Sequence, residues 1–562
     1  MVIRMKLNIK HTLIFIVGVL LVSFAIFLGV KNLFKVVVDN TAVKFLASDT
    51  KEVTLYNLDY NEGIKLLRGT KLEVTDKVIN NELEYYKTKY ENNEYLVLND
   101  NLVDDLVNVV LEKELYVRTP STLYKDLETI DINGLIKKGE KVDIIGYDEI
   151  KDGQVTMYKV KHNDKEGYVY SKYLVKTKEE TLKNYDEEDN YITHKNRGDS
   201  FGGGNAANLD YYPYEKPTFE DNVMPKDVRA LYLNAGVVYN VDEYIKVAKN
   251  SGINAFVVDI KDNTSPAYPS KVMKEYSPTN YKKAINSYET YQKAIKKLKE
   301  EGFYVIGRIT VFKDSYYVQD NPKDAILDNK TKNPYNHDGS YWPSAYRRDV
   351  WEFNVKLAIE AVEEMGFNEI QFDYVRFPDR TGNLEKEGII NFGNTYKEEK
   401  AQAIQRFVMY ACDEIHKHNA YVSIDVFGES AHQYVTAYGQ YWAAISNIAD
   451  VISGMPYPDH FSAHEYGISE VVWTVPYKLL NLWGSEFVMK RQNEIPTPAI
   501  VRTWIQTYDT GKYPSVTYDS YMISQQLKGL YEAGLTGGFM TWNGGSSLSK
   551  YESVKSAFGK DY

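Results

Sequence analysis

From residue 228 onward, short apolar runs alternate with longer stretches whose apolar residues recur at helical spacing. Apolar runs of about four to eight residues, bounded by turn residues, are typical of buried strands. The clearest helical stripe consists of Ala401, Ile404, Phe407, Val408, Ala411 and Ile415. Eight strand-like runs occur, at residues 228–233, 253–260, 304–312, 369–377, 421–427, 450–457, 499–505 and 537–542.

Eight successive strand–helix units predict an α/β fold, a closed parallel (β/α)8 TIM-like barrel over residues 227–560. The junctions support it, because a residue that tolerates the left-handed conformation precedes several strands. These residues are Gly252, Gly302, Gly366 and Gly534, with Asn419 before the fifth strand. The alternative is an open doubly wound sheet, but no Gly-rich phosphate loop follows the first strand.

An internal repeat precedes the barrel. Residues 85–103 (YYKTKYENNEYLVLNDNLV) align without gaps with residues 157–175 (MYKVKHNDKEGYVYSKYLV). Short alternating strands that repeat predict two small β-barrels, at residues 50–108 and 112–177. The second copy ends in GYVYSKYLV and resembles the bacterial SH3-like domains of secreted enzymes. That resemblance implies a peptide or cell-wall ligand, with a packed spacer as the alternative; for the first copy, which lacks the glycine, we favour the spacer.

Two further segments have a distinct composition. Residues 178–226 contain an acidic run, consecutive glycines and prolines that include Pro213 and Pro217, which predicts an extended linker. Residues 13–30 form an uncharged, largely apolar run of 18 residues, about the length needed to span a bilayer. No A-x-A-like cleavage site follows closely, so we expect an uncleaved anchor, with a cleaved signal peptide as the alternative.

The charge distribution indicates how the chain is oriented. Basic residues are frequent in the short segment before the apolar run, so we expect residues 1–12 in the cytoplasm and the C-terminal bulk outside a bacterial cell. The whole chain has a net charge of −11, which argues against nucleic acid as a partner. The single cysteine, Cys412, excludes an intramolecular disulfide.

In a (β/α)8 barrel the active site forms at the carboxyl ends of the strands, so polar and aromatic residues there are candidates. The candidates for substrate binding are Asp259, Lys261, Asp262, Arg308, Trp342, Tyr374, Arg376, Tyr457, Arg502, Trp504, Trp542 and Asn543. Carboxylates within apolar strands are costly to bury without a partner. For Asp259, a structural bridge to Lys261 and a catalytic role are both open; for Asp373, the strand-end position and nearby Arg376 favour an ionised carboxylate in the pocket.

The chain resembles a bacterial family of glycoside hydrolases with a (β/α)8 fold over about residues 226–560. The segments that carry the resemblance are residues 366–379 (GFNEIQFDYVRFPD), 253–262 (INAFVVDIKD) and 422–428 (VSIDVFG). The resemblance implies carbohydrate as substrate class and Asp373 as the catalytic carboxylate. The chain departs from the family at Trp342, which is followed by Pro-Ser-Ala-Tyr rather than an aspartate and a Pro-Tyr pair.

Glycosidases need two carboxyl groups across the scissile bond, one acid and one nucleophile or base. Strands four and five are adjacent, so we assign Asp373 as the nucleophile or base and Asp425 as the acid, with Glu429 as a substitute acid. These residues predict a membrane-anchored hydrolase of an envelope or external polysaccharide. The alternative is a catalytically inactive barrel that binds envelope glycan as a scaffold.

Other chemistries find less support in the sequence. Asp259 and Asp262 could gather a divalent cation, but no His pair at ligand spacing accompanies them, so we expect no metal. A serine nucleophile would require a motif such as G-x-S-x-G, which the sequence lacks. We therefore expect no cofactor.

Overall fold

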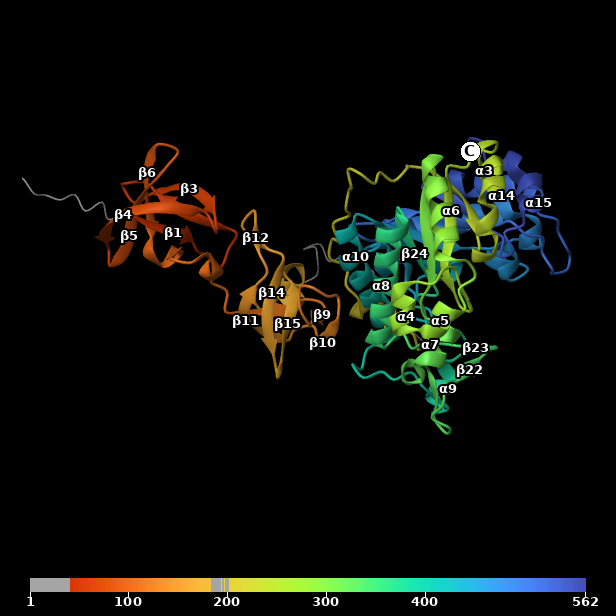
Figure 1. Cartoon of the computed structure of the whole chain (residues 1–562), viewed down its shortest axis with the longest axis horizontal. Coiled ribbons are helices and arrows are strands. Elements are labelled where there is room, and N and C mark those ends of the chain that lie inside the picture. Colours follow the sequence, from red (N-terminus) through yellow and green to blue (C-terminus); the bar gives the residue numbers. More distant parts are fainter. Residues whose placement is uncertain (1–40, 183–193, 195–196, 198–201) are drawn as a thin grey trace, which may run out of the picture. The chain divides into compact units, whose positions relative to one another are not determined.

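The computed structural model describes residues 41–182, 194, 197 and 202–562 (Figure 1). Within those residues no helix has the length and apolar character that a membrane crossing requires. The predicted cytoplasmic segment 1–12 and anchor 13–30 lie outside the described residues. The chain divides into two compact units, the first with the described residues up to Glu114 and Ile144–Tyr158, the second with Leu115–Asp143 and Lys159–Tyr562.

The repeat corresponds to two seven-stranded sheets with equivalent strand orders, β3-β2-β6-β5-β4-β1-β7 and β10-β9-β15-β14-β11-β8-β16. The first sheet consists of β1 (Ala42–Leu46), β2 (Glu52–Tyr56), β3 (Glu62–Leu67), β4 (Lys71–Asn80), β5 (Leu83–Tyr90), β6 (Asn93–Leu98) and β7 (Leu102–Val103). The second consists of β8 (Glu114–Val117), β9 (Ser121–Tyr124), β10 (Ile132–Ile136), β11 (Lys141–Tyr147), β14 (Met157–His162), β15 (Lys165–Tyr170) and β16 (Leu174–Val175). The first sheet begins before residue 50, and the assignment of both as SH3-like modules stays a prediction.

The C-terminal part is a nearly closed parallel barrel, which confirms the predicted fold class. Its strands are β17 (Val228–Leu233), β18 (Ala255–Asp262), β20 (Tyr304–Thr310), β24 (Glu369–Asp373), β26 (Tyr421–Phe427), β27 (Val451–Met455), β28 (Ile500–Val501), β29 (Thr503–Gln506) and β30 (Gly538–Trp542). The segments β28 and β29 flank Arg502 and together form the seventh strand. Because β28 pairs with β27 and β29 pairs with β30, this interrupted strand joins the two ends of the sheet and nearly closes the ring.

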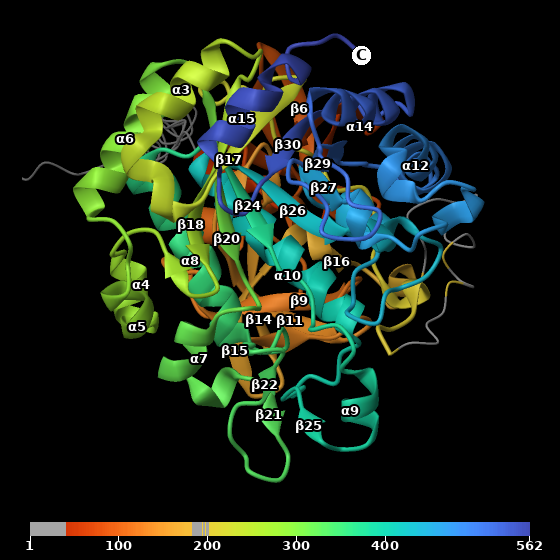
Figure 2. The same ribbon diagram turned by 90° about the vertical axis from the view of Figure 1, so that its right-hand side faces the viewer.

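Amphipathic helices surround the barrel strands, and Figure 2 shows α3, α6, α12 and α14 around them. The helices are α3 (Val241–Lys249), α4 (Lys271–Tyr276), α5 (Pro278–Lys282), α6 (Tyr288–Glu300), α7 (Ser315–Asp320), α8 (Arg348–Met365), α9 (Gly382–Lys386), α10 (Lys400–Ile415), α11 (Trp442–Ser446), α12 (Pro476–Leu482), α13 (Met489–Gln492), α14 (Ser520–Glu532) and α15 (Leu548–Val554). The predicted junctions have the expected backbone: Gly366 ends α8 with φ 81°, and Asn419 has φ 55° before β26.

Barrel strands point alternate side chains into the ring, and these side chains form the central core. The inward-facing layer nearest the strand starts is mainly apolar and aromatic and includes Val228, Ala255, Tyr304 and Tyr421, beside one buried ion pair between Glu369 and Arg502. Charged residues replace it toward the carboxyl ends, where β18, β20, β24 and β26 contribute Asp259, Arg308, Asp373 and Asp425. The fold therefore concentrates the predicted chemistry at one end of the barrel.

The prediction of an extended linker at residues 178–226 is wrong for its described part from residue 202 onward. Ala206, Leu209 and Tyr211 are buried in a cluster with residues of α10 and α11. The ring of Tyr211 also stacks on His194 at a centroid distance of 3.9 Å. The Gly, Pro and acidic content suggested an open chain, but the aromatic and aliphatic side chains between them bury apolar surface on the barrel.

Aromatic residues at the end of the second sheet form hydrogen bonds with α10 inside the same compact unit. The Tyr173 hydroxyl donates to Asp413 Oδ2 at 2.8 Å, and the Tyr170 hydroxyl donates to Glu414 Oε1 at 3.1 Å. Both tyrosines are buried. The aromatic GYVYSKYLV ending thus makes structural contacts with the barrel domain, as the spacer alternative requires.

Candidate active site

A buried arginine links two carboxylates at the carboxyl ends of neighbouring strands. Arg308 on β20 donates from Nη1 to Asp259 Oδ1 at 2.8 Å and from Nη2 to Asp373 Oδ2 at 2.6 Å. The Tyr232 hydroxyl donates to the other Asp259 oxygen at 2.6 Å. Burial raises the pKa of Asp259 to about 6, although Arg308 and Tyr232 oppose that rise. Asp259 thus holds the Arg308 guanidinium in place, and Arg308 in turn fixes one oxygen of the Asp373 carboxylate.

The backbone turns sharply directly after Asp373. Tyr374 has φ 52°, in the left-handed region that a residue with a side chain seldom adopts. Its amide donates to Asp373 Oδ1 at 2.6 Å. The turn ends β24 at Asp373, earlier than the predicted limit at residue 377, and strained residues of this kind concentrate at functional sites. Together with Arg308, the turn gives both Asp373 oxygens a donor.

Asp425 lies at the level of Asp373 on the adjacent strand. The parallel register pairs Gln371 with Ser423 and Phe372 with Ile424, so the next pair along is Asp373 and Asp425. Burial, with the neighbouring Asp373 charge as the next cause, raises the pKa of Asp425 well above its usual range. A raised pKa favours the protonated carboxylic acid. The pair therefore combines an arginine-bound carboxylate with a proton donor.

The Asp425 carboxyl group is buried but has few hydrogen-bond partners. Trp504 Nε1 donates to its Oδ1 at 2.8 Å. Its Oδ2 is buried and has no hydrogen-bond partner in the described part of the chain. An unsatisfied buried oxygen is unusual in proteins and calls for an explanation. A proton on Asp425, with a substrate oxygen as its acceptor, would satisfy this group.

A cavity of about 190 Å³ opens at Asp373, whereas Asp425, only 1% exposed, is not among the residues that line it. It is lined by Asp262, Arg308, Asp373, Tyr374, Arg376, Phe427, Met455, Tyr457, His460, Trp504 and Trp542. Trp504 and Trp542 meet edge to face at 5.6 Å, and Tyr457 stacks on Trp542 at 6.4 Å. Aromatic rings of this kind offer apolar faces, while the charged groups around them offer polar contacts.

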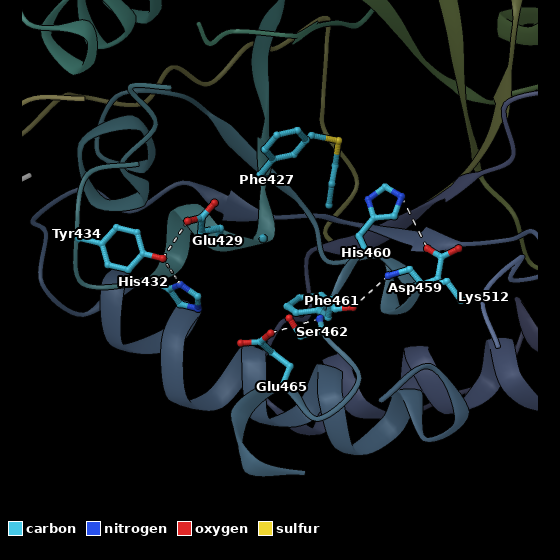
Figure 3. A pocket seen from close by; sticks show the side chains of 12 residues that line it. Phe427, Glu429, His432, Tyr434, Asp459, His460, Phe461, Ser462, Glu465 and Lys512 are labelled. Carbon is cyan, nitrogen blue, oxygen red and sulfur yellow. Dashed lines mark hydrogen bonds and ion pairs between the residues drawn. The ribbon is translucent and has the colours of Figure 1, made fainter. Parts of the chain in front are cut away.

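A second hollow, of about 600 Å³, shares three lining residues with this cavity. The shared residues are Phe427, Met455 and His460. Figure 3 shows Glu429 and Tyr434 on one side of the hollow and Asp459 and His460 on the other. The predicted substitute acid Glu429 lies here, where it accepts hydrogen bonds from the hydroxyls of Tyr434 at 2.9 Å and Tyr438 at 2.8 Å.

Lys261 does not form the bridge with Asp259 that was one of the two alternatives left open for that carboxylate. An irregular register in β18 separates Asp259 from Lys261 along the pairing with β20, so the two side chains have different partners. Lys261 Nζ is fully buried and donates to Asp314 Oδ2 at 2.7 Å. It does not line the cavity above Asp373. The bulge explains why spacing along the strand gave the wrong partner.

Arg502 is also displaced from the expected strand end. It lies between β28 and β29 and donates from Nη1 to Glu369 Oε1 at 2.7 Å, with both side chains fully buried. Glu369 is the first residue of β24, so this ion pair belongs to the opposite end of the barrel from Asp373. The predicted run 499–505 did not show that Arg502 lies near the start of the seventh strand, which continues to Gln506.

Two other candidates stabilise surrounding loops rather than line the cavity. Trp342 is buried against Tyr374 at a centroid distance of 5.7 Å, behind the cavity wall. Asn543 Nδ2 donates to the Thr507 carbonyl oxygen at 3.0 Å, and its Oδ1 accepts from the Ser547 amide at 3.2 Å. Both positions are consistent with supporting roles near the site.

Sequence reasoning missed Tyr232 and His460. Tyr232 sits inside the first apolar strand, and its hydroxyl contact with Asp259 depends on which face it occupies. The inward alternation of β17 is the signal that could have identified it. His460 follows the sixth strand and lines both hollows, but the sequence analysis did not select it as a candidate. Among the described residues, no group of His, Cys, Asp and Glu is arranged to hold a metal ion.

Comparison with known proteins identifies a family for the barrel. Residues 230–548 match the family described as "Putative glycosyl hydrolase domain". No curated protein matches. Among solved structures, a hypothetical protein from Ruminiclostridium thermocellum is 29% identical, with 35% of this chain and 97% of that chain covered and a TM-score of 0.30.

Two further solved structures also match, one of a glycoside hydrolase domain and one of a chitinase. The glycoside hydrolase domain of PgaB (BpsB) from Bordetella bronchiseptica is 11% identical, with 60% of this chain and 100% of that chain covered and a TM-score of 0.43. A class V chitinase from Pseudomonas fluorescens Pf-5 is 15% identical, with 59% and 99% covered and a TM-score of 0.37. All three TM-scores are below 0.5, so the family match alone supports the classification.

Proposed function

Because this chain belongs to the glycosyl hydrolase family that residues 230–548 match, we propose that it cleaves an envelope or external polysaccharide with Asp373 and Asp425. One observation carries the proposal: an arginine-bound carboxylate and a carboxyl group with a raised pKa lie at the same level on adjacent strands. Hydrolysis of a glycosidic bond by paired carboxyl groups uses one protonated group as the acid and one ionised group as the nucleophile or base.

The two carboxyl groups have different roles. Asp425 protonates the glycosidic oxygen as the bond to the leaving group breaks, because its environment keeps the proton on the carboxyl group. Asp373 acts as the nucleophile or base, since Arg308 and the Tyr374 amide fix both of its oxygens. Tyr457, Trp504 and Trp542 provide faces for a sugar ring above them.

The joined hollows suit a polymeric substrate. A cavity of about 190 Å³ that adjoins a hollow of about 600 Å³ gives room for neighbouring sugar units along one chain. In this proposal the apolar segment 13–30 anchors the chain in the bacterial membrane, and the barrel acts outside the cell. The second β-module could additionally bind a cell-wall ligand.

The test compares the full chain with Asp373→Asn and Asp425→Asn on polysaccharide extracted from the native envelope, with new reducing ends as the measure. Wild type should release reducing ends, and both variants should lose this activity. Asp349→Asn is the matched control, because Asp349 is about half exposed on α8 and does not line the cavity. Glycan binding without cleavage by any form would refute hydrolysis and favour the scaffold alternative.

A further inference from the structure

Arg376 is a buried cation in the wall of the proposed catalytic cavity. It follows Asp373 by three residues and is only 6% exposed. Its guanidinium lies 4.4 Å from the centroid of the Phe427 ring and 5.1 Å from those of Trp342 and Tyr374. Aromatic faces attract a cation but accept no conventional hydrogen bond from its N–H groups. The surroundings of Arg376 therefore leave most of its donors unused.

The described residues satisfy only one edge of this guanidinium. Nη1 donates to the Phe377 carbonyl oxygen at 3.1 Å and lies 3.5 Å from Asp379 Oδ1. Asp379 has a side chain that is 42% exposed, so solvent screens this ion pair. Nε and Nη2 make no hydrogen bond within the described part of the chain, although an arginine fork is suited to two parallel acceptors.

Arg308 provides an internal comparison, because it lines the same cavity. Asp259 and Asp373 both accept hydrogen bonds from Arg308 and compensate its charge. The ion-pair partner of Arg376 is instead Asp379, which is 42% exposed, and burial lowers the pKa of Arg376. A buried charge whose ion-pair partner is largely exposed is only weakly compensated, which favours binding of an anion.

A second cation flanks the same rings. Lys313 Nζ lies 4.8 Å from the centroid of the Tyr374 ring and 5.9 Å from that of Trp342. Within the described chain no carboxylate lies within ion-pair distance of Lys313, whose Nζ donates to the Tyr374 hydroxyl at 3.5 Å. Lys313 and Arg376 thus place two cations beside the rings of Trp342 and Tyr374, although the whole chain is acidic.

We propose that Arg376 binds an anionic substituent, a carboxylate or a phosphate, on the sugar unit that occupies the cavity. The two unused donors and the planar fork provide the recognition, and the aromatic rings hold the guanidinium in place. This inference deepens the proposed function, on which its relevance to a substrate rests. The anion preference itself can be measured without turnover.

The experiment measures binding of D-glucose, D-glucuronate and glucose 6-phosphate to the full chain by NMR titration. Wild type should bind at least one of the two acids about tenfold or more tightly than glucose, since a hydrogen bond to a charged group contributes about 1.5–3 kcal/mol. Arg376→Gln should lose this preference and keep its affinity for glucose. Arg376→Lys should keep part of it, because the charge remains without the fork.

Arg380→Gln is the matched control. Arg380 lies on the same loop, but its side chain is 73% exposed and pairs with Asp379 and Asp338, so this substitution should leave the preference intact. Each preference is a ratio within one variant, which corrects for partial loss of folded protein. Equal wild-type binding of all three sugars, or a preference that survives in Arg376→Gln, would overturn the inference.

The outcomes separate this inference from the proposed function. Cleavage of envelope polysaccharide without an anion preference leaves the hydrolase assignment intact and refutes the role of Arg376. An anion preference that depends on Arg376, in a protein that cleaves no polysaccharide, supports the binding site and refutes the hydrolase assignment. A preference for the carboxylate over the phosphate identifies a uronic-acid type of unit, and the reverse identifies a phosphorylated sugar.

Discussion

The buried carboxyl group of Asp259 should make the stability of the barrel depend on pH. Its pKa is raised from 3.8 to about 6, chiefly by burial. Below pH 3.8 the group is protonated in both the folded and the unfolded chain and contributes no pH dependence. Between pH 3.8 and about pH 6, Asp259 is largely ionised in the unfolded chain but largely protonated in the folded chain. The free energy of unfolding therefore falls as pH rises through this interval.

The magnitude follows from the shift. A rise of about two units, at about 1.4 kcal/mol a unit, corresponds to about 3 kcal/mol of stability lost between about pH 4 and pH 7. In Asp259→Asn the neutral amide cannot ionise. The difference in free energy of unfolding, variant minus wild type, should therefore increase by about 3 kcal/mol over this interval, whatever its value at pH 4.

Tryptophan fluorescence in denaturant titrations can follow the barrel selectively, because all seven tryptophans of the chain lie between residues 342 and 542. Tyr232→Phe is the companion variant. It removes a hydrogen bond that lowers the pKa of Asp259, so its stability should fall more steeply with pH than that of wild type. A variant-minus-wild-type difference for Asp259→Asn that stays constant or decreases toward neutral pH would refute this reasoning.

Three further predictions concern the proposed acid and the barrel interior. Wild-type hydrolysis should decline as pH rises through the raised pKa of Asp425. The Trp504→Phe substitution removes a hydrogen bond that lowers this pKa, so the alkaline limb of the pH–rate profile should shift to higher pH. An alkaline limb at the same pH as in wild type would contradict the proposed role of Asp425 as the acid. Glu429→Gln should retain turnover and the same alkaline limb, whereas normal turnover in Asp425→Asn together with loss in Glu429→Gln would transfer the acid role to Glu429. Arg502→Met leaves Glu369 buried without its cation and should lower the free energy of unfolding by about 3–5 kcal/mol in denaturant titrations; a loss below about 1 kcal/mol would disprove the structural role.

The barrel could be predicted because its strands are buried on both sides and read as continuous apolar runs. The limits of β17 and β26 coincide with the predicted runs 228–233 and 421–427. The fourth strand did not end as predicted, because the apolar residues after Asp373 continue the pattern while the backbone at Tyr374 leaves it. A run of apolar residues indicates burial, but it does not indicate a backbone turn at a residue other than glycine or proline.

The candidate site could be predicted only in its residue types. Strand ends supplied Asp259, Arg308 and Asp373, which the fold brings together. Their pairing could not be read from spacing, because a bulge in β18 directs Lys261 to Asp314 and leaves Asp259 to an arginine on the next strand. Such pairings depend on the cross-strand register, which a single sequence does not determine.

The ion pair at the strand starts also helps to explain why the proposed acid has a donor. Side chains two or four residues apart along a strand share a face. Glu369 and Asp373 therefore both point into the barrel from β24, and Arg502 and Trp504 both do so across the break between β28 and β29. The Arg502–Glu369 ion pair keeps the Arg502 side chain on the inner face of the barrel. Because Trp504 is two residues further along the same strand, it also faces inward, where it donates to Asp425. A one-residue slip of the seventh strand would turn Trp504 outward, so a structural interaction remote from the cavity influences the surroundings of the proposed acid, Asp425.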